Sequence, residues 1–308
     1  MGILYLVIPC YNEEAVIEHT VEELTPLLAD LERKSKIAPE SRILLVDDGS
    51  KDTTWEKIET LHRENPFVCG LKLAHNRGHQ NALMAGLMEA RKYCDCAVSM
   101  DADLQDDIHI LEAFIDKFNA GTDIVYGVRN KRETDTFFKR TTALGFYKVM
   151  HLLGVETVYN HADYRLMSCR AIQQLCRFRE RNLYLRGLVP LIGYQTACVY
   201  YNRDKRFAGE SKYPFKKMLN FAIDGITSFS VKPVRMVFWL GCIFILIAVC
   251  VTIWTLRAYY FHDTVPGWSS LMISLWLVGG TILVSLGIVG EYIGKIYIEV
   301  KNRPRYNE

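Results

Sequence analysis

The chain has 308 residues, of which 50% are hydrophobic and 23% charged, with mean hydropathy +0.03 and formal net charge +2. This composition excludes an intrinsically disordered chain, and a charge so near neutrality excludes a protein that binds nucleic acid over its whole surface. Nine cysteines are scattered without a C-x-x-C pair, which is typical of reduced cytosolic thiols rather than of disulfides or a zinc site.

Short apolar runs alternate with helical patterns along the first 130 residues. The predicted strands are Ile3–Ile8, Ile43–Val46, Cys69–Leu73, Ala97–Met100 and Ile124–Val128, and the predicted helices are Glu13–Leu31, Thr53–His62, Gly78–Tyr93 and Ile108–Phe118. This alternation predicts an α/β fold with a mostly parallel sheet, covered on both faces, whose ligands bind at the carboxyl ends of the strands. From Thr136 to Tyr201 the pattern is more helical and less regular.

The composition changes after Tyr201. Residues 203–235 hold eight basic and three acidic side chains, and two uncharged segments follow, Met236–Leu256 and Ser269–Gly290, of 21 and 22 residues. Each is long enough to cross a bilayer, where about 20 residues suffice. Basic residues precede the first segment and follow the second, so the positive-inside rule places both ends of the chain in the cytoplasm.

These features predict three parts. Residues 1–202 form a cytosolic domain, residues 203–233 a basic loop and an amphipathic juxtamembrane helix, and residues 234–308 a two-span transmembrane domain with a short cytosolic tail, in a multi-pass protein of the plasma (inner) membrane. The apolar stripe of 214–231 favours a helix on the membrane surface, and the alternative is an ordinary amphipathic helix packed on the domain.

Acidic residues cluster directly after two of the predicted strands. Asp47 and Asp48 follow one strand, and Asp101 and Asp103 follow another. Carboxylates gathered at the ligand-binding edge of a sheet repel one another unless a cation or donor neutralises them. Mg²⁺ or Mn²⁺ typically takes one or two carboxylates together with substrate phosphates. The pattern therefore indicates a divalent cation and a nucleotide.

Several motifs resemble those of family 2 glycosyltransferases. The matching segments, in family order, are 9–14 (PCYNEE), 46–52 (VDDGSKD), 76–80 (NRGHQ) and 101–105 (DADLQ). In the tail, 225–230 (GITSFS), 233–235 (PVR) and 290–294 (GEYIG) look like the bactoprenol (polyprenyl-phosphate) glucosyltransferase branch, which is GtrB-like. The resemblance spans nearly the whole chain.

The resemblance implies a GT-A (Rossmann-like) fold and an activity. The expected reaction is the inverting transfer of a hexose from a UDP-sugar to undecaprenyl phosphate on the cytosolic membrane face, with Mg²⁺ or Mn²⁺ as cofactor. Glucose is the leading candidate for the hexose. Members of the family can form tetramers, so a homo-tetramer is compatible with the resemblance. The nearest alternative is a dolichol-phosphate-mannose-type or aminoarabinose-type enzyme that uses another nucleotide sugar.

The resemblance also implies roles for individual residues. The nucleotide-sugar pocket is expected to include Pro9, Tyr11, Glu13, Asp48, Arg77 and Asp101, and the metal ligands are expected to be Asp101 and Asp103. From the residues alone, Glu13 fits equally well as a cap of the following helix.

A third acid, Asp163, aligns with the proposed catalytic carboxylate of the family. The second pKa of a phosphate is about 6, so a lipid phosphate is largely deprotonated at neutral pH without a base. Asp163 is therefore expected to orient groups or tune charge at least as much as to accept a proton. The alternative is a surface carboxylate paired with Arg165.

Binding of a phosphate acceptor beside a diphosphate donor requires cations, and arginine suits bidentate contact with phosphate. The candidates for binding the acceptor phosphate are Arg129, Arg132, Arg203, Lys205, Arg206 and Lys212. For the last four the alternative is a solvated charged linker.

Two further functions are alternatives to this reaction. One is a processive polysaccharide synthase, whose usual Gln-x-x-Arg-Trp motif is absent from the sequence, and the other is a membrane-tethered nucleotide-binding regulator without turnover.

Overall fold

The structure, a computed structural model, describes residues 1–129, 161–178, 180, 183, 185–202 and 267–300, and seven single positions between 234 and 253. The described residues fall into two compact units. The first holds the seven strands of the described sheet, and the second holds the long helix α10 (Trp268–Val300).

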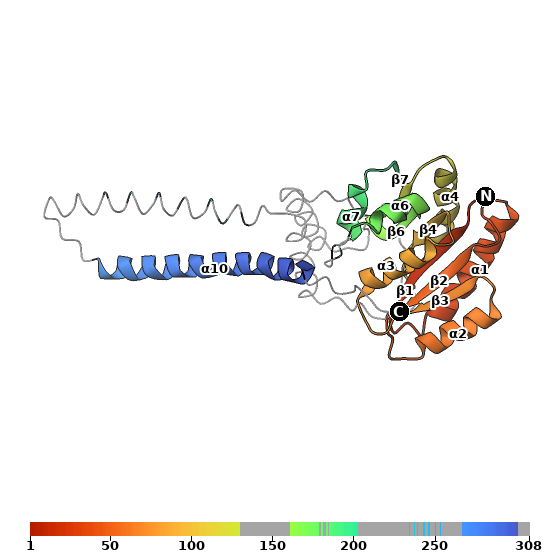
Figure 1. The fold of residues 1–308 in the computed structure, drawn as a ribbon, viewed down its shortest axis with the longest axis horizontal. Coiled ribbons are helices and arrows are strands. Elements are labelled where there is room, and N and C mark those ends of the chain that lie inside the picture. Colours follow the sequence, from red (N-terminus) through yellow and green to blue (C-terminus); the bar gives the residue numbers. More distant parts are fainter. Residues whose placement is uncertain are drawn as a thin grey trace. The chain divides into compact units, whose positions relative to one another are not determined.

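Strands and helices alternate through the first unit (Figure 1). In chain order they are β1 (Leu4–Cys10), α1 (Ile17–Arg33), β2 (Arg42–Asp47), α2 (Thr54–Glu64), β3 (Val68–Lys72), α3 (His79–Ala90), β4 (Cys96–Ser99), the 3-10 helix η1 (Ile108–Ile110), α4 (Leu111–Asn119), β5 (Ile124–Arg129), β6 (His161–Ser168), α6 (Cys169–Leu175), α7 (Leu185–Leu191) and β7 (Thr196–Tyr201).

The sheet has the order β3-β2-β1-β4-β6-β5-β7. Every neighbouring pair is parallel except those that involve β6, which runs antiparallel to β4 and to β5. The amino end of β6 therefore lies at the same edge as the carboxyl ends of the other strands. Residues from all seven strands of the described sheet can meet at that edge.

Both faces of the central strands are covered. Leu6 and Ile8 of β1 belong to a core with buried side chains of α1 and α4. Val7, between them in sequence, points to the opposite face, where a Cβ on Gly86 of α3 would lie 2.4 Å from it. Burial on both faces explains why these strands are continuous apolar runs rather than alternating ones.

The predicted α/β class with a mostly parallel sheet is confirmed, and each of the five predicted strands coincides with one of β1 to β5. The expectation of a more helical pattern between Thr136 and Tyr201 is wrong for β6 and β7. β6 carries Asp163 and Arg165 two residues apart, and these charges pair with each other. A central strand with a buried ion pair lacks the apolar signal by which strands are recognised.

Of the second unit, the structure describes α10, Gly267 before it and seven single helical positions between 234 and 253. Within the part of the chain that the structure describes, no helix combines the length and the apolar character that a membrane span requires. The predicted interfacial helix 214–231 and most of the first predicted span, 236–256, lie outside the described residues. The two spans and the three-part division of the chain stay predictions.

The contact of α3 with the sheet predicts the effect of Gly86→Val. The new side chain would overlap Val7 and Val46, whose nearest atoms lie 2.4 and 2.7 Å from a Cβ at this position. Overpacking of this kind costs about 1–3 kcal/mol. We expect a lower thermal midpoint of the detergent-solubilised protein by circular dichroism. Glu89→Val is the control, because it places the same β-branched residue at a half-buried position of α3; equal midpoints for the two variants would contradict this packing.

Candidate active site

The parallel topology brings most of the predicted site residues to one edge of the sheet. Asp48 follows β2, Asp101 and Asp103 follow β4, and Arg129 ends β5. Asp163 lies near the amino end of β6, which reaches the same edge because β6 is antiparallel to β4. Arg132, Arg203, Lys205, Arg206 and Lys212 lie outside the described residues.

The loops after β1 and β2 are tied together by hydrogen bonds. The backbone N–H of Asn12 donates to Ser50 Oγ at 3.0 Å, and Asn12 Oδ1 accepts from the backbone N–H of Lys51 at 2.9 Å. The N–H of Glu13 donates to Thr54 Oγ1 at 3.0 Å. Asn12 has φ of +53°, a left-handed conformation that asparagine tolerates. These ties hold the loop that carries the predicted nucleotide residues.

The predicted nucleotide residues of this loop differ in exposure. Pro9 is buried at the end of β1, whereas Tyr11 is 36% exposed. Glu13 is half-buried, and its carbonyl accepts from the backbone N–H groups of Val16 and Ile17. Tyr11 is therefore the side chain of this set best placed to meet a ligand from solvent.

Asp48 holds the loop that precedes α3. Its two carboxylate oxygens accept from the backbone N–H groups of Arg77 and Gly78, at 2.7 and 2.9 Å. Burial raises the pKa of Asp48, and the two N–H groups act against that rise. Close approach of the two loops requires Gly49, since a Cβ there would lie 2.6 Å from the backbone N of Asn76. Asp48 thus has a structural role that the sequence did not indicate.

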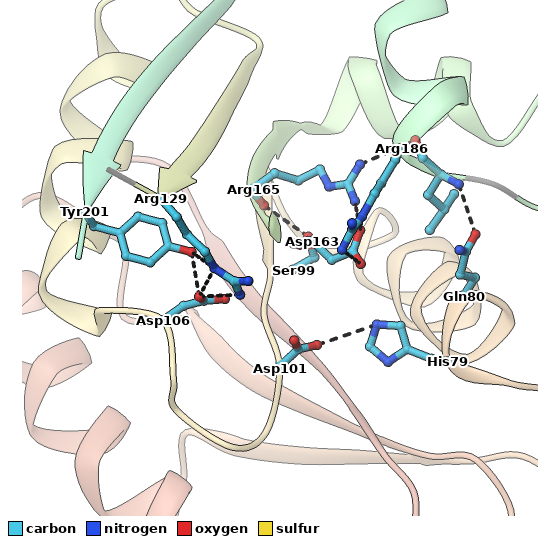
Figure 2. A network of polar contacts seen from close by, with 11 residues as sticks. His79, Gln80, Ser99, Asp101, Asp106, Arg129, Asp163, Arg165, Arg186 and Tyr201 are labelled. Atoms are coloured by element: carbon cyan, nitrogen blue, oxygen red, sulfur yellow. Dashed lines mark hydrogen bonds and ion pairs between the residues drawn. The ribbon is translucent and has the colours of Figure 1, made fainter. Parts of the chain in front are cut away.

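Asp101 stands at the centre of the acidic edge, between the groups of Asp106 and Asp163 in Figure 2. Its side chain is 45% exposed, and His79 Nε2 lies 3.6 Å from its Oδ1. Its pKa is raised, first by desolvation and then by the carboxylates of Asp163, Asp106 and Asp103, while His79 lowers it. A carboxylate that is crowded by others and still open to solvent suits a bound cation.

Asp103 lies on the loop after β4, where its Oδ1 accepts from the backbone N–H of Gln105 at 3.3 Å. Among the described residues, no three His, Cys, Asp or Glu side chains converge into a site made by protein ligands alone. Mg²⁺ usually binds through one or two carboxylates and completes its shell with water and substrate phosphates. Asp101 and Asp103 fit that ligand set.

Asp163 is clamped by two arginines. Arg165 Nη2 donates to its Oδ1, and Arg186 binds it through Nε at 3.2 Å and Nη2 at 3.0 Å. Burial acts to raise the pKa of Asp163, but the two guanidinium groups outweigh burial and hold the pKa well below its usual range. Its side chain is only 19% exposed, so Asp163 is not a surface carboxylate, although the pairing with Arg165 that the alternative named is present.

Arg129 is held in a buried polar group that the sequence did not reveal. Asp106, 5% exposed, accepts from Arg129 Nε at 3.0 Å, from Arg129 Nη2 at 2.8 Å and from Tyr201 Oη at 2.6 Å. The three residues come from the loop after β4 and from the ends of β5 and β7. They link that loop to the distal strands, so the position of Asp103 depends on them.

The buried Asp106 group predicts a measurable loss of stability in Asp106→Asn. The substitution leaves the guanidinium of Arg129 without its counter-charge, which costs about 1–3 kcal/mol for a partly exposed partner. We expect a lower thermal midpoint. Asp116→Asn removes an exposed ion pair with Lys36 on the surface and is expected to leave the midpoint unchanged. Equal shifts in the two variants would refute the role assigned to Asp106.

Two family models match the chain. Glycosyl transferase family 2 matches residues 5–176, and the GtrB C-terminal hairpin matches residues 232–296. The relative named uncharacterized glycosyltransferase YkoT, from Bacillus subtilis (strain 168), is 52% identical over 304 residues, which are 99% of this chain and 90% of the relative. The SfII prophage-derived bactoprenol glucosyl transferase of Shigella flexneri is 38% identical over 306 residues, which are 98% and 96% of the two chains.

A solved structure, the mannosyltransferase PcManGT from Pyrobaculum calidifontis in complex with GDP-Man and Mn²⁺, is 16% identical, with a TM-score of 0.47 over 98% of this chain and 87% of that chain. The family 2 model covers more than half of this chain, and the two relatives extend the match over nearly all of it. The chain therefore belongs to glycosyl transferase family 2.

Proposed function

We propose that this chain is an inverting glycosyltransferase that moves a hexose, with glucose as the leading candidate, from a UDP-sugar to undecaprenyl phosphate. The products are the polyprenyl-phosphate sugar and UDP. The observation that carries the proposal is the near full-length match to a bactoprenol glucosyl transferase, which includes the C-terminal hairpin as well as the family 2 domain. The alternative donors are those of dolichol-phosphate-mannose-type and aminoarabinose-type enzymes.

Tyr11 is the exposed residue of the set proposed for the donor. It would bind the base and ribose together with the half-buried Arg77 and Glu13 and the buried Pro9 and Asp48. Asp101 and Asp103 would hold Mg²⁺ or Mn²⁺, which when bound stabilises the negative charge of the departing diphosphate. The loop ties around Asn12 and Asp48 keep these groups in place before the donor arrives, so little ordering remains to be done on binding.

The acceptor needs recognition rather than deprotonation. A phosphate oxygen attacks the anomeric carbon as the bond to the diphosphate breaks, in one displacement that inverts the configuration and needs no covalent enzyme intermediate. Because the lipid phosphate is already deprotonated at neutral pH, the residues of the chain have to orient it and balance its charge. Arg129 and the basic residues at 132 and 203–212 are proposed for this task.

A lipid acceptor fits a membrane enzyme. We propose that 203–233 lies on the cytosolic membrane surface and that 236–256 and 269–290 cross the membrane. In support, the described side chains of α10 include large apolar groups that are 54–65% exposed, namely Leu271, Leu275, Ile282, Val284, Leu286 and Ile293. Exposed apolar surface on this scale is unfavourable in water and favourable in lipid.

Turnover tests the reaction directly. Purified protein is incubated with undecaprenyl phosphate and a panel of radiolabelled nucleotide sugars, and lipid-linked label is measured with and without EDTA. We expect label from UDP-glucose, loss of activity with EDTA, and a fall of at least about a hundredfold in Asp103→Asn. Asp107→Asn, nearby on the same loop, is the control. Full activity in the presence of the chelator would exclude the metal, and UDP binding without sugar transfer would favour the regulator.

Membrane placement is tested separately. Membranes from expressing cells are washed with alkaline carbonate, and the chain is expected to stay in the pellet because two apolar segments anchor it. A version that ends at residue 233 measures what the amphipathic segment contributes alone. Release of the full chain into the carbonate supernatant would rule out the two spans.

A further inference from the structure

Arg186 is the residue of the site that neither the sequence motifs nor the proposed function uses. It lies at the start of α7 and binds both oxygens of Asp163, Oδ1 through Nε at 3.2 Å and Oδ2 through Nη2 at 3.0 Å. Figure 2 shows its guanidinium and that of Arg165 meeting at the same carboxylate.

The two arginines differ in their surroundings. Arg165 is 1% exposed, and its Nη1 also lies 3.5 Å from the backbone carbonyl of Leu185. Arg165 is therefore a buried residue with a structural role. The side chain of Arg186 is 32% exposed, and it binds Asp163 at the same edge where Asp101 opens to solvent.

Asp163 accepts from two guanidinium groups. The two guanidinium groups repel each other: burial lowers the pKa of Arg165, and Arg186 lowers it further, while Asp163 acts in the opposite direction. An anion bound beside the two guanidinium groups would offset that repulsion. Both substrates of the proposed reaction are phosphates.

The first turn of α7 is held so that Arg186 stays at this edge. The backbone N–H of Leu185 donates to Gln80 Oε1 at 3.0 Å, and Gln80 lies in the first turn of α3. The backbone of Leu185 is thus contacted from α3 and from β6, and the side chain of Arg186 from β6. A guanidinium fixed at several points loses little freedom when it binds a ligand.

We propose that Arg186 binds a substrate phosphate and that Asp163 is a positioning residue that holds the Arg186 guanidinium, rather than the group that takes a proton. This inference rests on the proposed function and deepens it. A guanidinium has five N–H donors along two edges, so one arginine serves a carboxylate and a phosphate together. Both oxygens of Asp163 accept from arginines, so its geometry suits holding a guanidinium in place.

The phosphate could belong to the acceptor or to the donor. Along the sheet order, the residues predicted for the base and ribose lie at or after the ends of β1, β2 and β3, the predicted metal ligands follow β4, and Asp163 lies on β6. Arg186 therefore meets the edge beyond the metal ligands as seen from the nucleotide. This order favours the acceptor monophosphate over the donor diphosphate, and the two give different kinetic signatures.

The experiment compares Arg186→Gln, Arg186→Lys, Asp163→Asn and the double variant Asp163→Asn/Arg186→Gln in detergent-solubilised full-length protein. KM for each substrate, kcat, and direct binding of UDP-sugar and undecaprenyl phosphate are measured. We expect Arg186→Gln to raise the acceptor KM by about ten- to a hundredfold, as for a lost hydrogen bond to a charged group. Arg186→Lys keeps the charge and should lose less. Asp163→Asn should raise the same KM, and the double variant should be no worse than Arg186→Gln.

Arg170→Gln is the matched control. Arg170 binds both oxygens of Asp123 through Nε and Nη2, as Arg186 binds Asp163, but at the opposite edge of the sheet. This variant should leave both KM values unchanged. A rise in the donor KM of Arg186→Gln instead of the acceptor KM would also support phosphate binding and would identify the diphosphate as the source.

Two results would overturn the inference. One is unchanged affinity of Arg186→Gln for both ligands, which is measurable whether or not turnover occurs. The other is a loss of kcat in Asp163→Asn with both KM values unchanged while Arg186→Gln is silent, which is the signature of a base. A wild-type protein that binds both ligands and transfers no sugar would contradict the proposed function instead. Arg165 remains paired with Asp163 in Arg186→Gln, so the fold should persist, and circular dichroism checks it.

Discussion

Negative charge is crowded at one edge of the sheet, and the loops and arginines around that edge are arranged to offset it. The parallel topology brings carboxylates to this edge, and the fold compensates three of them, each in a different way. Asp48 accepts from two backbone N–H groups, Asp106 from Arg129 and Tyr201, and Asp163 from two arginines. Asp101 has only an imidazole at 3.6 Å among the ion pairs of the described residues. The charge left uncompensated is therefore local, and it marks where a divalent cation fits.

This distribution divides the edge by task. The end near β1 and β2 is fixed by hydrogen bonds between loops, so it offers a shaped surface with an exposed aromatic ring. The middle is acidic, and the end near β6 and β5 carries arginines already engaged with carboxylates. A nucleotide, a cation and a phosphate can then lie in sequence along one edge. That order suits a displacement in which one phosphate attacks and another leaves.

The sequence predicted the first half of the fold well because its strands are apolar runs separated by regular helical patterns. It failed at β6, where a strand inside the sheet carries a buried ion pair, and at the edge strand β7. The sequence indicated the site candidates Asp48, Asp101, Asp103 and Asp163, because carboxylates that follow strands or stand in family motifs can be recognised without the structure. Asp106 and Arg186 were missed, since their partners lie 23 residues or more away in the chain and only the folded sheet brings them together.

Binding of Mn²⁺ at Asp101 can be measured without turnover. Mn²⁺ is titrated into the detergent-solubilised protein in the presence of UDP, and the free ion is followed by electron paramagnetic resonance. We expect the wild-type chain and Asp116→Asn to bind the ion, and Asp101→Asn to lose most of that affinity because the uncompensated carboxylate is gone. Equal affinity of Asp101→Asn and the wild-type chain for Mn²⁺ would show that the uncompensated charge at Asp101 does not hold the cation.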